Sequence, residues 1–251
     1  MRCRVLRQER VGDGIYALWI EAPTMTTAMA GQFVHVLCGD SYLRRPFSVF
    51  AIDGDAIGIL YRVTGAGTRW LTSVSTGDSL DVLGPLGHGF TPPFAGERVV
   101  VVGGGVGVAP LALFASQHPE ATAEAVLGFR NDAAVAGIEP FMRHAVPLTL
   151  LTEVGIAGLP GRVTDGLTER IATSRATRIL TCGPDPMMRA VAHIAETLGL
   201  ACQLSVERPM GCGVGLCLGC VLPILDAAGA FRYDRSCVEG PVFGAREVSW
   251  L

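Results

Sequence analysis

The sequence predicts a chain of three parts: a small antiparallel β barrel, a doubly wound α/β domain and a small C-terminal domain rich in cysteine. Three observations support this fold class. Short β-like segments broken by turns fill the first third of the 251 residues. Apolar strands alternate with helical stretches in the middle, and four of the eight cysteines lie in the last forty residues. We place the domains at 1–92, 93–206 and 207–251.

The first part contains stretches of strand-like composition separated by turn residues, at 5–10, 15–21, 32–38, 47–52 and 57–63. A helix is expected at 68–74, after two glycines. A closing strand is expected at 79–83, before a Gly-Pro turn. Pro92 and Pro93 mark the end of the barrel, because proline donates no hydrogen bond to a sheet.

The second part changes period at residue 94, with apolar strands at 99–102, 125–129, 148–151 and 179–181 and a helix at 185–198. Residues 99–116 carry no charge and have the length of a membrane span. Four glycines and Pro110 interrupt them, however, and this pattern suits a buried parallel strand, a tight turn and a packed helix. We therefore predict no membrane span.

Composition excludes several classes of function. Hydrophobic residues make up 49% of the chain and charged residues 17%, which argues against disorder and suggests burial against cofactors or another subunit. A net charge of −3 without a long run of one sign predicts no nucleic-acid partner. The N-terminus has no signal-peptide pattern, so we expect a cytoplasmic protein with reduced thiols.

The clustered cysteines predict a metal centre. Cys212, Cys217 and Cys220 have the spacing C-x4-C-x2-C, and Cys237 follows after sixteen intervening residues. This is the plant-type [2Fe–2S] spacing, and the glycines among them permit backbone N–H groups to approach sulfur. The alternative is a structural zinc site, which normally pairs two C-x2-C knuckles or adds histidine.

A second group of residues predicts a flavin site in the barrel. Arg45 supplies a cation for a pyrophosphate, and the Ser48 hydroxyl can reach a flavin ring atom. Glycines at the start of the helix near Thr68 create an anion site, and Tyr61 can stack on the flavin or on adenine. The alternative is an ordinary β edge with a surface arginine. The assigned residues are Arg45, Pro46, Phe47, Ser48, Leu60, Tyr61, Arg62, Gly67 and Thr68.

A third group predicts a nicotinamide nucleotide site in the α/β domain. Glycines follow its first strand and open a helix, where a pyrophosphate can approach the helix N-terminus. The segment that starts at Cys182 lies at the end of a later strand, on the same edge of the sheet. Tight packing of strand on helix, and a buried thiol, are the alternatives. The assigned residues are Gly103, Gly104, Gly105, Gly107, Cys182, Gly183 and Pro184.

These motifs resemble those of the ferredoxin-reductase superfamily. The strings R-P-F-S at 45–48, Y-R-V-T-G-A-G-T at 61–68 and G-P-L-G at 84–87 look like its FAD-binding barrel. The string C-G-P-D-P-M at 182–187 resembles the segment beside its nicotinamide. The resemblance implies FAD as the flavin, with Ser48 near its reactive edge, Arg45 at its pyrophosphate and Cys182 beside hydride transfer; Ser48 and Cys182 are the expected catalytic residues.

The whole chain resembles, in order, the electron-transfer subunits of dihydroorotate dehydrogenase B, most strongly at 205–220 and 237–243. The resemblance implies that an FMN-containing catalytic subunit oxidises dihydroorotate in pyrimidine biosynthesis. Electrons then pass through the cluster and FAD of this chain to NAD+. It also implies a heterotetramer of two copies of each subunit.

Other readings stay open at this stage. Diaphorase subunits of NADH-dependent ferredoxin:NADP oxidoreductase, which is a bifurcating transhydrogenase, and of sulfhydrogenases share the architecture. In the former, one cluster ligand can be aspartate, so four cysteines favour the dihydroorotate reading. A redox sensor, a zinc-stapled module and a reductase of a soluble acceptor are further alternatives. The choice between NAD and NADP is open, and we treat all five histidines as structural or surface residues.

Overall fold

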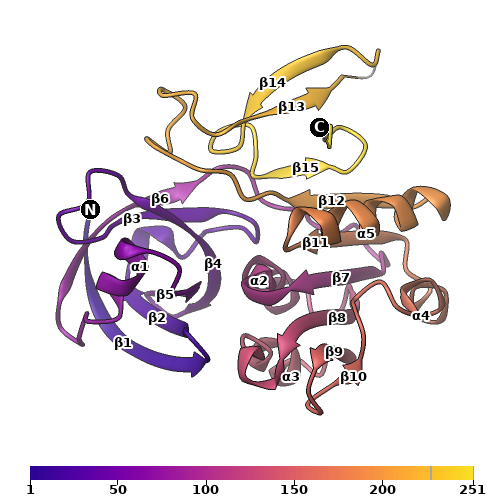
Figure 1. Ribbon diagram of the computed structural model, residues 1–251, viewed down its shortest axis with the longest axis horizontal. Helices are drawn as coiled ribbons and strands as arrows, with labels where there is room; N and C mark the ends of the chain where they lie inside the picture. Colours follow the sequence, from indigo (N-terminus) through magenta and orange to yellow (C-terminus); the bar gives the residue numbers. More distant parts are fainter. Residues whose placement is uncertain (227, 251) are drawn as a thin grey trace.

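The computed structural model of the chain describes residues 1–226 and 228–250. A β barrel stands beside an α/β domain, and the C-terminal segment runs along the top of both (Figure 1). The predicted fold class is confirmed. Among the described residues, no helix is long and apolar enough to cross a membrane.

Six antiparallel strands close the barrel in the order β1-β2-β5-β4-β3-β6. Side chains alternate between the core and the surface, so that Cys3 and Val5 are buried while Arg2 and Arg4 are exposed. The strands are β1 (Arg2–Gly12), β2 (Ile15–Glu21), β3 (Phe33–Leu37), β4 (Arg45–Asp53), β5 (Ala56–Arg62) and β6 (Ser79–Leu86), with a 3-10 turn η1 (Pro23–Met25) between β2 and β3.

The barrel helix α1 (Ala66–Leu71) begins earlier than expected. The Thr68 hydroxyl accepts hydrogen bonds from the backbone N–H groups of Thr64 and Gly65, at 2.9 and 3.0 Å. A residue at the third helical position that binds the N-cap backbone fixes the start of a helix, and Thr68 therefore lies inside the first turn.

The second sheet has the order β10-β9-β8-β7-β11-β12-β15 and is parallel from β10 to β12. The sequence prediction missed the short strands β10 and β12. Its strands are β7 (Val99–Gly104), β8 (Thr122–Asn131), β9 (Leu148–Val154), β10 (Leu159–Pro160), β11 (Arg178–Cys182), β12 (Ala201–Ser205) and β15 (Val242–Gly244). Its helices are α2 (Val108–Gln117), α3 (Glu139–Arg143), α4 (Leu167–Ser174) and α5 (Asp185–Thr197), with 3-10 turns η2 (Gly105–Gly107) and η3 (Asp132–Ala134).

Strand β7 shows why this sheet is covered on both faces. Val99 and Val101 pack in one core with α2 and the barrel, whereas Val100 and Val102 pack in another with α4 and α5. A central parallel strand buries both of its faces, which explains the unbroken apolar run. The charge-free residues 99–116 thus form a strand, a turn and a helix, as predicted.

The C-terminal segment joins both domains. Strands β13 (Val221–Leu225) and β14 (Phe231–Arg235) form a hairpin, while β15 pairs antiparallel with β12 at the edge of the large sheet. Between them, the Gly240 carbonyl accepts a hydrogen bond from the His88 N–H at 2.6 Å, just after β6 of the barrel. The segment therefore lies at the junction of the barrel and the sheet.

Candidate functional site

The four clustered cysteines lie together as two pairs. The Cys212 N–H contacts Cys217 Sγ at 3.4 Å, and the Cys217 N–H contacts Cys212 Sγ at 3.4 Å. Cys220 and Cys237 are buried together in one cluster with Phe33 of β3. The loop between β12 and β13 and the turn after β14 thus meet at one place.

Backbone N–H groups surround the first pair. Cys212 Sγ also accepts from Val214 and Leu216, at 3.4 and 3.3 Å, and Cys217 Sγ accepts from Gly219 at 3.5 Å. The N–H groups of Val214 and Cys217 lower the pKa of the Cys212 thiol to about 6. This loop is therefore built to stabilise anionic sulfur.

The pairing bears on the kind of metal that these thiols can hold. A binuclear [2Fe–2S] cluster takes two protein ligands on each iron. Two pairs of thiols with N–H groups directed at sulfur therefore fit this cluster.

The two parts of the flavin motif meet across the barrel surface. A Cβ atom added at Gly67 of α1 would lie 3.3 Å from Nε of Arg45 on β4, so the Arg45 side chain lies over the first turn of α1. Ser48 is half-buried on the same strand, and Pro46 pairs with His35 of β3. The structure thus brings Arg45, Gly67 and Thr68 together.

Tyr61 lies in the barrel core. Its ring is buried, stacks on Tyr16 at a centroid distance of 5.6 Å and lies 5.8 Å from the Phe47 ring. Its hydroxyl donates a hydrogen bond to Gln8 Oε1 at 3.0 Å, and burial raises its pKa. In this structure Tyr61 is a core residue, and its stacking on a flavin stays a prediction.

The nucleotide turn packs directly on the Cys182 segment. A Cβ atom added at Gly107 would lie 2.5 Å from the Cys182 carbonyl oxygen, and one added at Gly104 would lie 2.6 Å from Sδ of Met187. Strands β7 and β11 are neighbours, and the chain reverses its order along the sheet between them. In doubly wound sheets such a point is where ligands bind. Gly107 and Gly183 thus pack against backbone atoms at this edge, whereas Gly103 and Gly104 pack against the side chains of Leu127 and Met187.

Gly105 is the exception among these glycines. Its φ of +55° favours glycine, and its nearest neighbour outside the turn is the Arg62 guanidinium, at 3.8 Å from an added Cβ atom. Arg62 belongs to β5 of the barrel, together with Leu60. The turn therefore faces the barrel, with a cation at the junction.

Cys182 ends β11 between Gly103 of β7 and Ser205 of β12. Burial raises the pKa of its thiol to about 12, and a hydrogen bond with Ser205 opposes this only in part. Burial thus favours the neutral thiol, which can line a nicotinamide site. Pro184, two residues on, precedes helix α5.

His35 is a site residue that sequence reasoning missed. It is fully buried on β3, and a Cβ atom added at Gly213 of the cysteine loop would lie 2.5 Å from its Nδ1. The ring thus lies against the cysteine loop, on a strand that pairs with β4 of the flavin motif. A histidine within the apolar run 33–37 was the available signal, because a polar side chain in such a run is buried for a reason.

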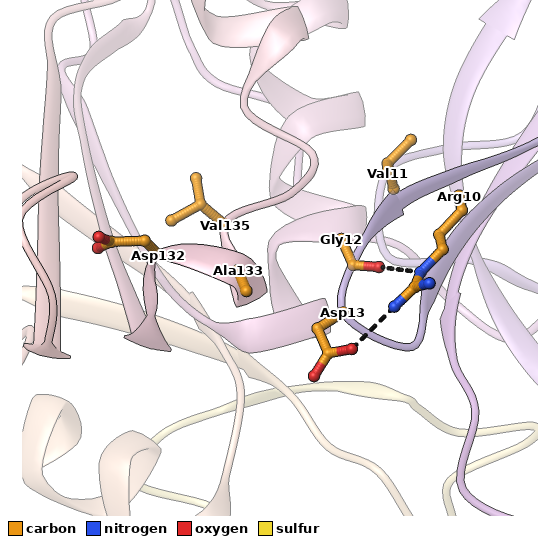
Figure 2. Close-up of a pocket in the computed structure, with 7 residues that line it drawn as sticks. All are labelled: Arg10, Val11, Gly12, Asp13, Asp132, Ala133 and Val135. Atoms are coloured by element: carbon orange, nitrogen blue, oxygen red, sulfur yellow. Dashed lines mark hydrogen bonds and ion pairs between the residues drawn. The ribbon is translucent and has the colours of Figure 1, made fainter.

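One surface hollow lies elsewhere. A cavity of about 460 Å³ opens between the β1–β2 hairpin and η3 (Figure 2). Arg10 there pairs with Asp13 at 2.9 Å, while Asp132 points away and accepts from the N–H groups of Ile156 and Ala157. Because its charged groups are already paired and no predicted site residue lines it, we do not assign a ligand to it.

Comparison with known proteins identifies relatives over nearly the whole chain. Residues 207–249 match the family model described as the iron-sulfur cluster binding domain of dihydroorotate dehydrogenase B. The dihydroorotate dehydrogenase B (NAD+) electron transfer subunit of Caldanaerobacter subterraneus subsp. tengcongensis is 37% identical, covering 99% of this chain and 98% of that one. That of Geobacillus thermodenitrificans is 38% identical, covering 98% and 97%.

Solved structures agree with this result. An NADH-dependent reduced ferredoxin-NADP oxidoreductase, studied for flavin-based electron bifurcation, has a TM-score of 0.86 at 27% identity, covering 99% of this chain and 90% of that one. A cytochrome P450 reductase from Amycolatopsis shares the fold, with a TM-score of 0.69 at 22% identity over 78% of this chain and 66% of that one. With relatives above 30% identity over nearly their full length, the chain belongs to the family of dihydroorotate dehydrogenase B (NAD+) electron transfer subunits.

Proposed function

We propose that this chain transfers electrons from an FMN-bearing dihydroorotate dehydrogenase catalytic subunit, through a [2Fe–2S] cluster and FAD, to NAD+ in pyrimidine biosynthesis. The observation that carries the proposal is the order of the three sites. The paired thiols pack on the barrel beside the flavin motif, and the nucleotide turn faces the same barrel through Arg62. When bound, FAD exchanges single electrons with a cluster and electron pairs with a nicotinamide.

Cys212, Cys217, Cys220 and Cys237 would hold the cluster. The first pair lies in the more open loop, with Cys217 exposed, while the second pair is buried. The N–H groups directed at Cys212 and Cys217 stabilise the negative charge on their sulfurs. Hydrogen bonds of this kind also raise the reduction potential of the centre that the sulfurs hold.

In the barrel, Arg45 would neutralise the pyrophosphate of FAD, and Ser48 would donate its hydroxyl proton toward the flavin ring. Arg45 is available for this role because, within the described part of the chain, its Nη1 binds the nearby carbonyls of Leu43 and Arg44 and no carboxylate. Thr68 has a structural role, because its hydroxyl accepts the hydrogen bonds that fix the first turn of α1. Pro46, Phe47 and Gly67 shape the surface around these groups.

In the α/β domain, the turn at Gly105 would take the nucleotide pyrophosphate, with Arg62 as its cation. Cys182, Gly183 and Pro184 would form the adjoining wall for the nicotinamide. Because burial favours the neutral Cys182 thiol, this residue would contribute shape and a low local polarity to that wall.

Exposed apolar side chains around the cysteine loop support a partner subunit. Leu216 in the loop is 83% exposed and Tyr233 on β14 is 71% exposed, and the same loop and hairpin expose four more large apolar side chains. Apolar surface of this extent is typical of a protein interface. We propose that the catalytic subunit binds here, in a heterotetramer of two copies of each chain. The four other exposed apolar side chains of this loop and hairpin are Val214, Leu218, Val221 and Phe231.

We further propose the division 1–92 for FAD, 93–206 for NAD and 207–251 for the cluster. The strand order of the barrel and the sheet supports the first boundary. The boundary between residues 206 and 207 divides two functions but not two separate folding units, because β15 of the cluster segment extends the large sheet. Eight free thiols are consistent with work in the reducing cytoplasm.

A second candidate is a diaphorase subunit of an NADH-dependent ferredoxin-NADP oxidoreductase. The TM-score of 0.86 with that structure favours it. The cofactors and the residues that bind them would be the same, and only the partner would differ.

The test is anaerobic purification with and without a co-expressed dihydroorotate dehydrogenase catalytic subunit. We expect co-purification, flavin and [2Fe–2S] absorbance, and dihydroorotate-dependent reduction of NAD+. A brown protein that oxidises NADH but ignores this partner would support the diaphorase candidate. A colourless protein that contains zinc would overturn both.

A further inference from the structure

The side chain of Arg235, the last residue of β14, links the two segments that supply the cysteine pairs. Its Nη1 donates a hydrogen bond to the Gly215 carbonyl at 3.0 Å, in the loop between Cys212 and Cys217. Its Nε donates to Oε2 of Glu239 at 3.0 Å, in the turn that follows Cys237. One guanidinium thus binds both segments.

Further contacts fix the position of the Arg235 side chain. The Arg235 N–H donates to Glu239 Oε2 at 2.8 Å, and Nη2 donates to Oε1. A Cβ atom added at Gly215 would lie 3.0 Å from Arg235 Nη1 and 2.7 Å from the Val238 side chain. The loop is therefore seated directly on the guanidinium, and a side chain at position 215 would displace it.

The charge of this group also matters. Its hydrogen bonds to Glu239, and to a smaller extent the nearby Cys237 and Cys220 thiols, raise the pKa of the Arg235 guanidinium. Both charged side chains are about one third exposed, so their fields are only partly screened by water. Reducing a cluster adds one negative charge. A nearby cation therefore favours the reduced form, and a nearby carboxylate disfavours it.

We propose that Arg235 is a positioning residue for the cluster, which fixes the loop of Cys212 and Cys217 against the turn of Cys237 and, together with Glu239, sets the reduction potential. The proposal rests on the proposed function, because it assumes that these four thiols hold a [2Fe–2S] centre. The ion pair of Arg235 and Glu239 thus has two roles. The Arg235 guanidinium holds the two segments together, and the opposite charges of Arg235 and Glu239 act on the thiols in opposite directions.

The experiment measures the midpoint potential of the cluster by redox titration followed by electron paramagnetic resonance, in the co-purified complex. Arg235→Gln removes the cation, so we expect a more negative potential. Glu239→Gln removes the carboxylate but keeps an acceptor for Arg235, so we expect a more positive one. Arg235→Lys keeps the charge and loses the two-sided hydrogen bonding. We expect its potential near that of the wild type, with cluster affinity about tenfold lower, as judged by bleaching with a chelator.

Arg232→Gln is the matched control, because Arg232 lies on the same strand but pairs with Asp234. Shifts of opposite sign at 235 and 239, beyond that control, support the proposal. If both variants shift the midpoint potential in the same direction, or neither shifts it, and the wild type still shows the cluster spectrum, the proposal is overturned and the proposed function is not. If Arg235→Gln holds no cluster, the positive shift in Glu239→Gln decides the question. A wild-type protein without cluster absorbance would overturn the proposed function itself, and this inference with it.

Discussion

Substituting Gly107 by alanine tests whether the two halves of the nucleotide site are packed as described. The new Cβ atom would lie 2.5 Å from the carbonyl oxygen and 2.6 Å from the carbonyl carbon of Cys182. These are backbone atoms of β11, which is hydrogen-bonded to β7 on one side and β12 on the other. Since β11 cannot yield, the turn at 105–107 must move.

Inserting a methyl group into a packed site costs about 1–3 kcal/mol. If this whole cost falls on nucleotide binding, the KM for NADH rises roughly 5- to 150-fold. The assay is NADH oxidation with ferricyanide as the acceptor, which needs only FAD and the nucleotide site. We expect the change in KM to exceed that in kcat, because the proposed role of the turn is to bind the nucleotide pyrophosphate.

Gly54→Ala is the control for backbone strain. Gly54 lies in the β4–β5 turn with a φ of +55° and open space around it. Its substitution should lower the melting temperature slightly and leave the KM unchanged. A Gly107→Ala protein whose KM stays within about twofold of the wild type, too little for even the lower cost, would refute the packing argument.

Three further predictions concern other parts of the chain. Glu97 and Arg178 form an ion pair at 3.0 Å with both side chains under 10% exposed, and Glu97→Gln leaves Arg178 buried without its charged partner. We expect the free energy of unfolding, measured by chemical denaturation, to fall by about 3 kcal/mol. An unchanged denaturation midpoint would contradict this. Burial lowers the pKa of His35 to about 4, so the wild type should lose stability relative to His35→Gln as the pH falls from about 6.5 to about 4. If the stabilities of the two proteins changed with pH in parallel, His35 would not be a buried neutral ring. Arg45→Gln should release FAD on gel filtration with the fold intact by circular dichroism, and full flavin retention would remove Arg45 from the pyrophosphate site.

The pH prediction follows from the direction of the shift. A histidine whose folded pKa is depressed binds fewer protons in the folded state than in the unfolded state between the two pKa values. Stability therefore rises with pH across that window and is fully present above about 6.5. The measurement compares denaturation midpoints of the two proteins at several pH values.

Contacts between residues close in sequence were predictable from spacing alone. The cysteines at 212, 217 and 220 span a single loop, so their separation limits where the thiols can lie. The order of valines, glycines and then helix formers in 99–116 likewise predicted a strand, a turn and a helix. Local sequence determines these features because few backbone angles separate the residues involved.

Only the tertiary structure decided which distant segments meet. The buried Tyr61 ring, the contact of His35 with the cysteine loop and the addition of β15 to the large sheet had no signature in spacing. The link from Arg235 to both cysteine segments is of the same kind. Each depends on how the barrel and the sheet pack against each other. That packing is fixed by the whole buried core and not by any one motif.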